Sequence, residues 1–406
     1  MDNTNTSVAE IVSQPKPRNS NLELFRILVM LLIVAHHYVT ASGLMLPEGP
    51  MYSNPFSFNS LWLFLFGAWG KIGINCFVLI TGYFMCKSNI TLKKFIKLFA
   101  QVLFYGVIIN ALFLCFDPNF STHDFLSSQL PFLRIKDNFV ACFLVFFFFI
   151  PFLNILIKNL NEKQHIRLIA LCLFTYSVLA LRPIFDVSFN YVSWFMILYL
   201  VSSYIRLYPK KLFDNTKIWA ILLAITAGLS CAAVIGSVWV SAHYHRTIAY
   251  AYVADSNQLI AFVTSLCAFM TFKNLKIKTN KFINAVAATT FGVFLFHSYC
   301  APMRRWLWDD VFNNLGAYSH SWLFLHSIFA VVAVFCAGAL FDWIRLKWIE
   351  RPFMKYYDRL EPGILSRCQK IEDKFVHPNN VLENKDVPEQ KDEVPEQKEQ
   401  DEGVKQ

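Results

Sequence analysis

The chain alternates between long apolar stretches and short polar connections. A helix needs about 20 mostly apolar residues to cross the hydrocarbon core of a bilayer. The candidate stretches cover approximately residues 24–42, 61–86, 95–116, 139–157, 166–184, 191–207, 217–240, 258–272, 282–302 and 321–349. Those near 191 and 258 are the shortest. The pattern predicts an all-α, polytopic membrane bundle of about ten transmembrane helices.

Composition supports this interpretation for most of the chain. Hydrophobic residues make up 55% of the 406 residues and charged residues only 16%, whereas about a quarter of the residues of a soluble domain are charged. The 10 cysteines are scattered and form no Cys-x-x-Cys pair, so we expect them to pack as small side chains and to hold no metal. We therefore expect a multi-pass protein of the plasma (inner) membrane, in contact with the lipid bilayer.

Basic residues are distributed unequally between the two sides of the predicted bundle. When the connections are assigned alternately, 22 Lys and Arg fall on one side and 6 on the other. Cytoplasmic loops carry the excess of positive charge, so both termini are expected in the cytoplasm. The net charge of +9 is then explained by loops that face an anionic inner leaflet, and no nucleic-acid partner is needed.

Charge and hydropathy divide the chain into three regions. We expect residues 1–20 to form a cytoplasmic N-terminal tail and residues 21–357 to form the transmembrane domain. Residues 358–406 are expected to be a disordered, charged cytoplasmic tail, because dense charge with few apolar residues cannot build a core. Within this tail Val-Pro-Glu-Gln-Lys occurs twice, starting at Val387 and at Val394.

The first apolar stretch carries two ionisable residues, Arg26 and His37, with ten residues between them. Ionisable side chains are costly in lipid, so each is a candidate functional residue. Eleven helical steps place them about 16 Å apart along the axis and on nearly the same face, which suits the two ends of one long ligand. The alternatives are a snorkelling anchor for Arg26 and a hydrogen bond to a neighbouring helix for His37. His36 points about 100° away and is expected to be structural.

Four short elements follow one another along the chain. They are Arg26-x10-His37; Gly70, Gly73, Asn75, Phe77, Thr81, Gly82 and Tyr83; Phe291, Gly292, Leu295, Phe296 and His297; and Glu350, Arg351 and Pro352. Across about residues 20–357 this ordered set resembles the acyltransferase-3 family of integral membrane acyltransferases, in its single-domain, O-acetyltransferase-like form. Two features depart from the family pattern: Thr81 replaces a common serine, and lysines replace an arginine-rich third-span element.

The resemblance implies an enzyme that moves an acyl group, with acetyl expected, from a cytoplasmic acyl-coenzyme A to a hydroxyl of a cell-surface or lipid-linked carbohydrate. His37 would then be the catalytic general base, a task that suits a group whose ordinary pKa is near neutrality. Arg26, with Lys93, Lys94 and Lys97, would bind the phosphates of coenzyme A. Lysine neutralises phosphate without the bidentate fork of arginine, and the lysines are equally explained by the positive-inside rule.

Other candidates surround the two ends of this path. His297 is expected in the outer half of the ninth stretch, level with His37, so the two histidines are predicted to share a polar cavity or, alternatively, to make separate structural hydrogen bonds. Asn75 and Trp194 are candidates to line that cavity, although Trp194 also suits an interfacial aromatic belt. Glu350 is expected to orient a basic partner at the cytoplasmic mouth.

Two other function classes fit a basic, polytopic membrane protein. A transporter or flippase of an anionic or glycolipid substrate also places Arg and His within the membrane, but the sequence shows no internal repeat that would support it. A polysaccharide polymerase predicts a long outer loop rich in arginine. The longest outer connection, about residues 116–138, carries only Arg134 and Lys136, which argues weakly against a polymerase.

Overall fold

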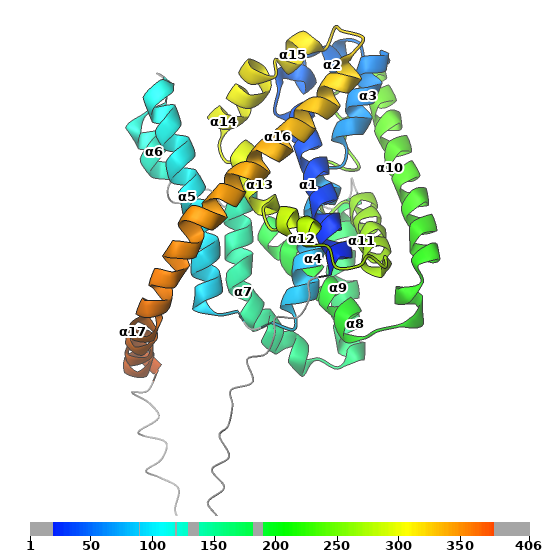
Figure 1. Ribbon diagram of the computed structural model, residues 1–406. Helices are drawn as coiled ribbons and strands as arrows, with labels where there is room; N and C mark the ends of the chain where they lie inside the picture. The colour runs from blue at the N-terminus through cyan, green and yellow to red at the C-terminus, as the bar shows by residue number, and fades with distance from the viewer. Residues whose placement is uncertain (1–18, 89, 118–119, 129–137, 182–189, 377–406) are drawn as a thin grey trace, which may run out of the picture. The chain divides into compact units, whose positions relative to one another are not determined.

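The structure is a computed structural model that describes residues 19–88, 90–117, 120–128, 138–181 and 190–376 (Figure 1). Within these ranges the regular elements are all helical, and the structure shows no strand. The α-helices are α1 (Ser20–Thr40), α2 (Pro50–Ser53), α3 (Phe58–Gly67), α4 (Gly70–Met85), α5 (Leu92–Phe116), α6 (Thr122–Ser128), α7 (Phe139–Asn159), α8 (Glu162–Leu173), α9 (Tyr191–Leu207), α10 (Thr216–Tyr244), α11 (Leu259–Asn274), α12 (Lys281–Ala287), α13 (Thr290–Ser298), α14 (Ala301–Arg305), α15 (Asn314–Ala317), α16 (Leu323–Arg345) and α17 (Arg351–Val376). The prediction of an all-α fold is confirmed for the described residues.

Six helical segments of the described chain are long and apolar enough to span a membrane: α1, α3 with α4, α5, α7, α10 and the segment that begins with α16. A seventh is formed if α12–α13 and the segment from α14 to Val311, which bend by 91° at their junction, count as one broken span. The apolar helices α9 and α11 have only 17 and 16 residues. The chain is therefore a multi-pass membrane protein by length and composition, while the count of about ten spans and the cytoplasmic termini stay predictions.

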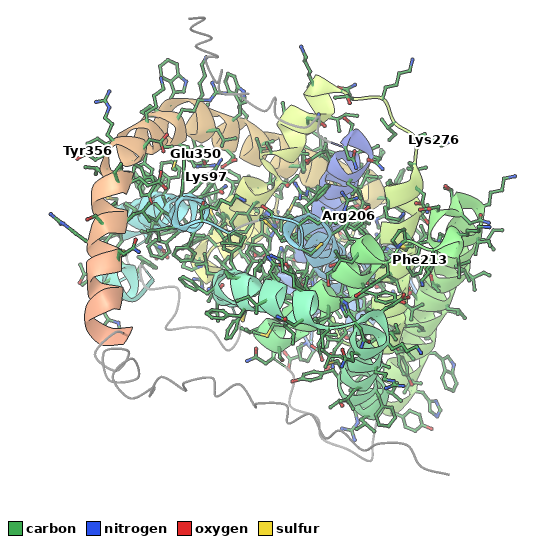
Figure 2. All side chains as sticks on the ribbon, turned by 90° about the horizontal axis from the view of Figure 1, so that it is seen from below. Lys97, Arg206, Phe213, Lys276, Glu350 and Tyr356 are labelled. Carbon is green, nitrogen blue, oxygen red and sulfur yellow. The ribbon has the colours of Figure 1, made fainter. Side chains whose placement is uncertain are left out.

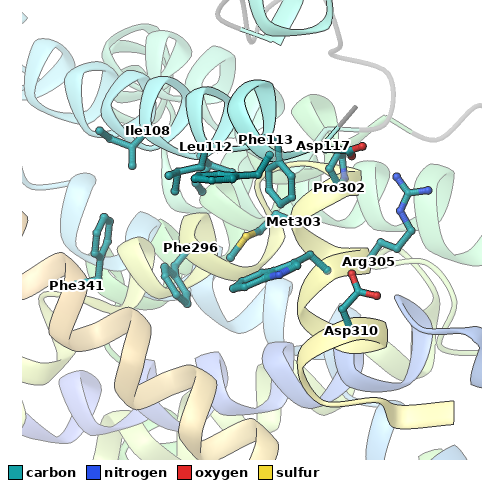
Figure 3. Close-up of a pocket in the computed structure, with 13 residues that line it drawn as sticks. Ile108, Leu112, Phe113, Asp117, Phe296, Pro302, Met303, Arg305, Asp310 and Phe341 are labelled. Carbon is teal, nitrogen blue, oxygen red and sulfur yellow. The ribbon is translucent and has the colours of Figure 1, made fainter. Parts of the chain in front are cut away.

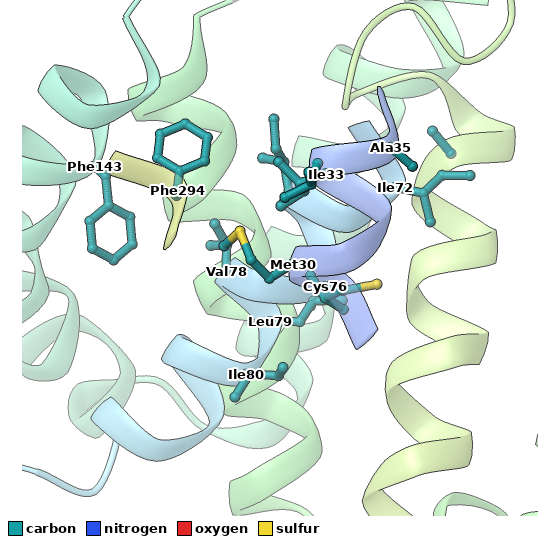
Figure 4. Close-up of a cluster of buried hydrophobic side chains, with 14 of the residues drawn as sticks. Met30, Ile33, Ala35, Ile72, Cys76, Val78, Leu79, Ile80, Phe143 and Phe294 are labelled. Atoms are coloured by element: carbon teal, nitrogen blue, oxygen red, sulfur yellow. The ribbon is translucent and has the colours of Figure 1, made fainter. Parts of the chain in front are cut away.

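Helix α1 runs through the middle of the helices that carry the candidate residues. It contacts α3, α4, α11, α12, α13 and α16 (Figure 1). Its buried face includes Met30 and Ile33, which lie beside Ile72 and Leu79 of α4 (Figure 4). Since α1 is enclosed by so many elements, a polar side chain on it meets protein rather than lipid.

Glycines let α4 approach its neighbours closely. A Cβ at Gly70 would lie 2.2 Å from the ring of His36, and one at Gly82 would lie 2.2 Å from Ser202 Oγ of α9. Small residues at such crossings let helix backbones come together in a membrane. A Cβ at Gly73 would likewise lie against Ile33 of α1. Helix packing therefore explains all three glycines of the second apolar stretch, Gly70, Gly73 and Gly82.

The chain divides into two compact units, residues 1–350 and 351–406. In the second unit α17 continues to Val376, so the tail expected from residue 358 is helical over its first nineteen positions. The helix includes Pro362 in its interior. The rest of the expected tail, residues 377–406, lies outside the described residues, as do residues 1–18.

Candidate active site

Two histidines from distant parts of the chain meet inside the first unit. His37 Nδ1, on α1, lies 2.9 Å from Nε2 of His297, on the last turn of α13. His297 is fully buried and His37 is half-buried. The pair that the sequence predicted from matching depth is therefore in direct hydrogen-bond contact.

The main chain around His297 decides how protons are arranged in this pair. His297 Nδ1 lies 2.6 Å from the carbonyl oxygen of Val293, which can only accept a hydrogen bond. In the neutral ring Nδ1 then carries the hydrogen, and Nε2 is left as an acceptor. His37 must donate from its own Nδ1, so its Nε2 keeps the lone pair. The geometry thus assigns a base to one named atom, Nε2 of His37.

His36 has a different environment from that of its neighbour. Its Nδ1 lies 2.6 Å from the carbonyl oxygen of Gly67, at the end of α3, and its ring fills the space beside Gly70. The residue ties α1 to the junction of α3 and α4. The structure accordingly gives His36 a bracing contact, in line with the role expected for it.

Arg26 lies eleven residues before His37 on the same helix. Its Nη1 is 3.3 Å from Glu23 Oε2, and its guanidinium carbon is 5.8 Å from the centre of the Phe84 ring. The Arg26 side chain is 25% exposed, and that of Glu23 only 7%. Arg26 is therefore held at one end of α1 and retains surface on which to contact a ligand.

The predicted lysine group lies on the first turns of α5. Lys97 Nζ is 2.7 Å from Glu350 Oε1 (Figure 2), Lys94 Nζ donates to Ser88 Oγ at 2.6 Å, and Lys93 precedes Lys94 on the same turn. Glu350 thus contacts a basic side chain from another helix, as expected, while its place at a cytoplasmic mouth stays a prediction.

Glu350 belongs to a larger buried network at the end of α16. Arg345 donates from Nη1 to Glu350 Oε2 at 2.7 Å and from Nε to Asp342 Oδ1 at 2.6 Å. Tyr105 Oη and Gln101 Nε2 of α5 donate to the same Asp342 oxygen, at 3.0 Å and 3.2 Å. The sequence analysis missed Asp342 and Arg345, although two opposite charges within one apolar stretch were the available signal.

Asn75 and Trp194 bind each other rather than the histidine pair. Trp194 Nε1 donates to Asn75 Oδ1 at 2.9 Å, and Asn75 Nδ2 donates to the Ser256 carbonyl at 2.7 Å. Both side chains are fully buried. Their polar groups therefore join α4, α9 and the segment before α11, and the structure places them in the wall of the bundle.

Two cations that the sequence analysis did not single out lie on helices packed against those that carry the histidines. Arg304 of α14 donates from Nη1 to the carbonyl of Ser298 at 3.1 Å, directly after His297. Lys71 of α4 donates from Nζ to Tyr191 Oη at 2.5 Å. Arg304 is one of the 6 basic residues that the charge count assigned to the outer connections, whereas a lysine inside the second apolar stretch was a visible signal for Lys71.

An apolar cavity of about 740 Å³ lies between α5, α13, α14 and α16. Phe296 and Met303 line it, so it adjoins the helices that carry His297 and Arg304. Its charged lining, Asp117, Arg305 and Asp310, gathers at one end (Figure 3). In the described part of the chain, no three His, Cys, Asp or Glu side chains converge to hold a metal ion.

Comparison with known proteins gives one finding that bears on this site. A family model described as an acyltransferase domain matches residues 19–343, most of the chain. The matched range contains Arg26, both members of the histidine pair and the α5 lysines. No curated protein and no solved structure matched the chain.

Proposed function

Because this chain belongs to the acyltransferase-3 family of membrane acyltransferases, we propose that it moves an acyl group from a cytoplasmic acyl-coenzyme A to a hydroxyl of a cell-surface or lipid-linked carbohydrate. Acetyl is the group we expect. The observation that carries the proposal is the histidine pair, in which His297 leaves Nε2 of His37 as a base.

In the proposed reaction His37 first accepts a proton and later gives it back. His37 Nε2 takes the proton of the acceptor hydroxyl, and the oxygen attacks the carbonyl carbon of the thioester. The tetrahedral intermediate collapses, the carbon–sulfur bond breaks and the new carbon–oxygen ester bond remains. The departing thiolate receives the proton from the His37 imidazolium. Atoms and charge balance without a metal ion or another co-reactant.

The donor is proposed to approach along α1 from its Arg26 end. The nucleotide part of coenzyme A is too highly charged to enter lipid, so its phosphates would stay with Arg26 and with Lys93, Lys94 and Lys97. The thin pantetheine arm would cover the distance of about 16 Å to His37. Glu350, which holds Lys97, would keep that lysine at the mouth. In this arrangement the protein lies in the plasma membrane with both termini in the cytoplasm.

One observation favours a second candidate, a transporter or flippase of an anionic or glycolipid substrate. The cavity of about 740 Å³ combines an apolar body with a charged end, which matches an amphiphile. The acyltransferase proposal is preferred because family membership and the histidine pair both support chemistry rather than passage.

The test follows the acyl group itself. Purified protein in lipid vesicles is given acetyl-coenzyme A labelled in the acetyl group, together with a mixed glycan and glycolipid acceptor pool. The proposal expects label in ester linkage on a carbohydrate, detected by mass spectrometry and removed by mild alkali. Passage of unmodified glycolipid across the vesicle, with no labelled ester, would support the transporter instead.

A further inference from the structure

Three consecutive residues of α1 bind three different parts of the bundle. His36 binds the main chain at the end of α3, and His37 binds His297 of α13. The hydroxyl of the next residue, Tyr38 Oη, lies 2.8 Å from Nδ1 of His326 on α16. Successive side chains of an α-helix point about 100° apart. The three contacts therefore hold α1 from three directions at the depth of His37.

The hydrogen bond between Tyr38 and His326 has a defined direction. His326 Nε2 lies 3.0 Å from the carbonyl oxygen of Phe312, which can only accept a hydrogen bond. In the neutral ring Nε2 then carries the hydrogen and Nδ1 is an acceptor, so the Tyr38 hydroxyl is the donor. A main-chain carbonyl thus fixes the tautomer of His326, as the Val293 carbonyl fixes that of His297.

Tyr38 is also held through its ring and its main chain. Its side chain is 0% exposed, and the ring packs edge-on against Trp308, with 5.7 Å between the ring centres. Its carbonyl oxygen accepts hydrogen bonds from Asn314 Nδ2 and Ser42 Oγ, both at 2.9 Å. These contacts fix the backbone of α1 one residue after His37.

Helix α16 connects this contact to the partner of His37. It packs against both α1 and α13. The approach to α13 is close, since a Cβ at Gly338 of α16 would lie 3.1 Å from Cα of Val293. Val293 is the residue whose carbonyl orients His297. The bond from Tyr38 to His326 therefore fixes α1 relative to the helices that hold His297.

The geometry of a helix shows why such a bond matters for catalysis. Side-chain tips lie about 5–6 Å from the helix axis, so a rotation of α1 by about 10° would move the His37 ring by about 1 Å. A displacement of that size can cost about 100-fold in rate. A neutral hydrogen bond adds little net stability, and apolar burial has no preferred direction. The polar pair supplies direction, which an apolar pair of equal size would not.

We propose that Tyr38 and His326 are positioning residues, which fix the rotation of α1 so that Nδ1 of His37 meets His297 and Nε2 faces the acceptor hydroxyl. The inference rests on the proposed function and adds two residues to its reaction. Tyr38 and His326 act through His37 and exchange no proton with the substrates.

The experiment uses the full-length protein in nanodiscs. Tyr38→Phe removes the donor and keeps the ring, and His326→Leu removes the acceptor. His326→Asn is the conservative variant, because its carbonyl oxygen takes approximately the place of Nδ1 and can accept from Tyr38. The matched control is Tyr199→Phe: Tyr199 is also 0% exposed, and its hydroxyl donates to a side chain of another helix, Asn154 Oδ1, at 2.6 Å.

The first readout is release of coenzyme A from acetyl-coenzyme A with the mixed glycan and glycolipid acceptor pool. Tyr38→Phe and His326→Leu should lower kcat about 10- to 100-fold and leave donor affinity unchanged. His326→Asn should recover most of the rate, and Tyr199→Phe should stay within about 3-fold of the wild type. In a His37→Gln background Tyr38→Phe should cost nothing further, because residues that act through one group are not additive.

The second readout needs no activity. Solid-state ¹⁵N spectra of histidine-labelled protein report which ring nitrogen of His37 carries the hydrogen, and the His37 signals are those that His37→Gln removes. The wild type and Tyr199→Phe should show one tautomer, with the hydrogen on Nδ1. Tyr38→Phe should show a second form with the hydrogen on Nε2, because the ring is released from His297.

A single His37 tautomer in Tyr38→Phe would overturn the inference, and so would coenzyme A release within about 3-fold of the wild type. A further loss from Tyr38→Phe in the His37→Gln background, or an equal loss in Tyr199→Phe, would show general damage to the bundle and would also overturn it. If the tautomer depends on Tyr38 but the wild type transfers no acetyl group, the positioning role stands and the proposed function fails. If Tyr38→Phe does not fold, the comparison of His326→Leu with His326→Asn decides.

Discussion

At the scale of single residues, the site depends on one hydrogen bond to the main chain. The Val293 carbonyl fixes the tautomer of His297, and His297 in turn fixes that of His37. A carboxylate commonly orients a catalytic histidine in hydrolases. Here a neutral imidazole does so, which holds the ring without adding a negative charge to the site.

Replacement of His297 tests this positioning role. His297→Phe keeps a ring but removes the acceptor for His37 Nδ1, so we expect kcat for acetyl transfer to fall about 100-fold, the typical cost of a misplaced catalytic group. His297→Gln retains a carbonyl acceptor and should keep more activity than His297→Phe. Donor affinity should not change in either variant. Equal loss in both variants would contradict an acceptor role for Nε2.

Arg26 gives a separate prediction about the donor. Arg26→Ala should weaken binding of coenzyme A, measured by isothermal titration calorimetry, by about 10- to 100-fold, the loss of one charge-assisted contact. Arg26→Lys should restore part of the affinity, because charge survives without the planar fork. Glu23→Gln serves as the control, since it removes the ion pair but leaves the guanidinium. Unchanged donor affinity in both Arg26 variants would make Arg26 a membrane anchor.

The residue scale also shows where sequence reasoning ends. The position of a residue within an apolar stretch gives the depth of its side chain, which is how His37 and His297 were paired. It does not show which neighbouring helix the side chain meets. Asn75 and Trp194 therefore seemed candidates to line a cavity and instead bind each other, whereas Arg304, counted among the 6 basic residues of the outer connections, binds the main chain next to His297.

At the scale of elements, the buried ion network joins α5 to α16, and α13 packs closely against it. Gly292 of α13 leaves room for Asp342, since a Cβ there would lie 2.1 Å from Asp342 Cγ. This close approach explains why a glycine belongs at that position. It also brings the helix that carries His297 against the charged network at the end of α16.

Gly292→Ala should therefore destabilise the protein. The added methyl group forces Asp342 away from Arg345, and overpacking of this kind costs about 1–3 kcal/mol. The melting temperature in detergent should fall by several degrees. Gly228→Ala in α10 is the matched control, because nothing lies within 4 Å of its Cβ position, and it should melt at or slightly above the wild-type temperature. Equal melting temperatures for the two variants would contradict this account of the packing.

The sequence patterns predicted where the helices lie better than where they bend or end. Each predicted apolar stretch contains helix in the described structure, because hydrophobic length is a direct consequence of the bilayer. The bend after Ser298, the junction between α3 and α4 and the helical extent of α17 were not predicted. These features depend on tertiary contacts and on local charge. Neither hydrophobic periodicity nor hydropathy contains that information.

At the scale of the whole molecule, orientation is the property on which the proposed path depends. An epitope inserted after Lys211 should be cytoplasmic, and one inserted after Glu48 should be extracytoplasmic. The reason is that basic residues are frequent in the connection around Lys211 and absent from the one around Glu48. Both positions are exposed, whereas Met51 further along the second connection is buried. The measurement is antibody binding to each epitope in intact and in permeabilised cells. Both epitopes on one side would change the span count.

The central claim is that Nε2 of His37 is the general base of an acyl transfer, and one kinetic comparison tests it most directly. Release of coenzyme A from acetyl-coenzyme A is measured with purified wild type, His37→Gln and His36→Gln, at saturating donor and with the mixed glycan and glycolipid acceptor pool. A general base contributes about 100- to 10,000-fold, so His37→Gln should lose at least about 100-fold in kcat while it retains donor affinity. His36→Gln, which removes the ring beside Gly70 and alters the contact with the Gly67 carbonyl but leaves the His37–His297 pair in place, should lose far less. Equal rates for wild type and His37→Gln would contradict the account.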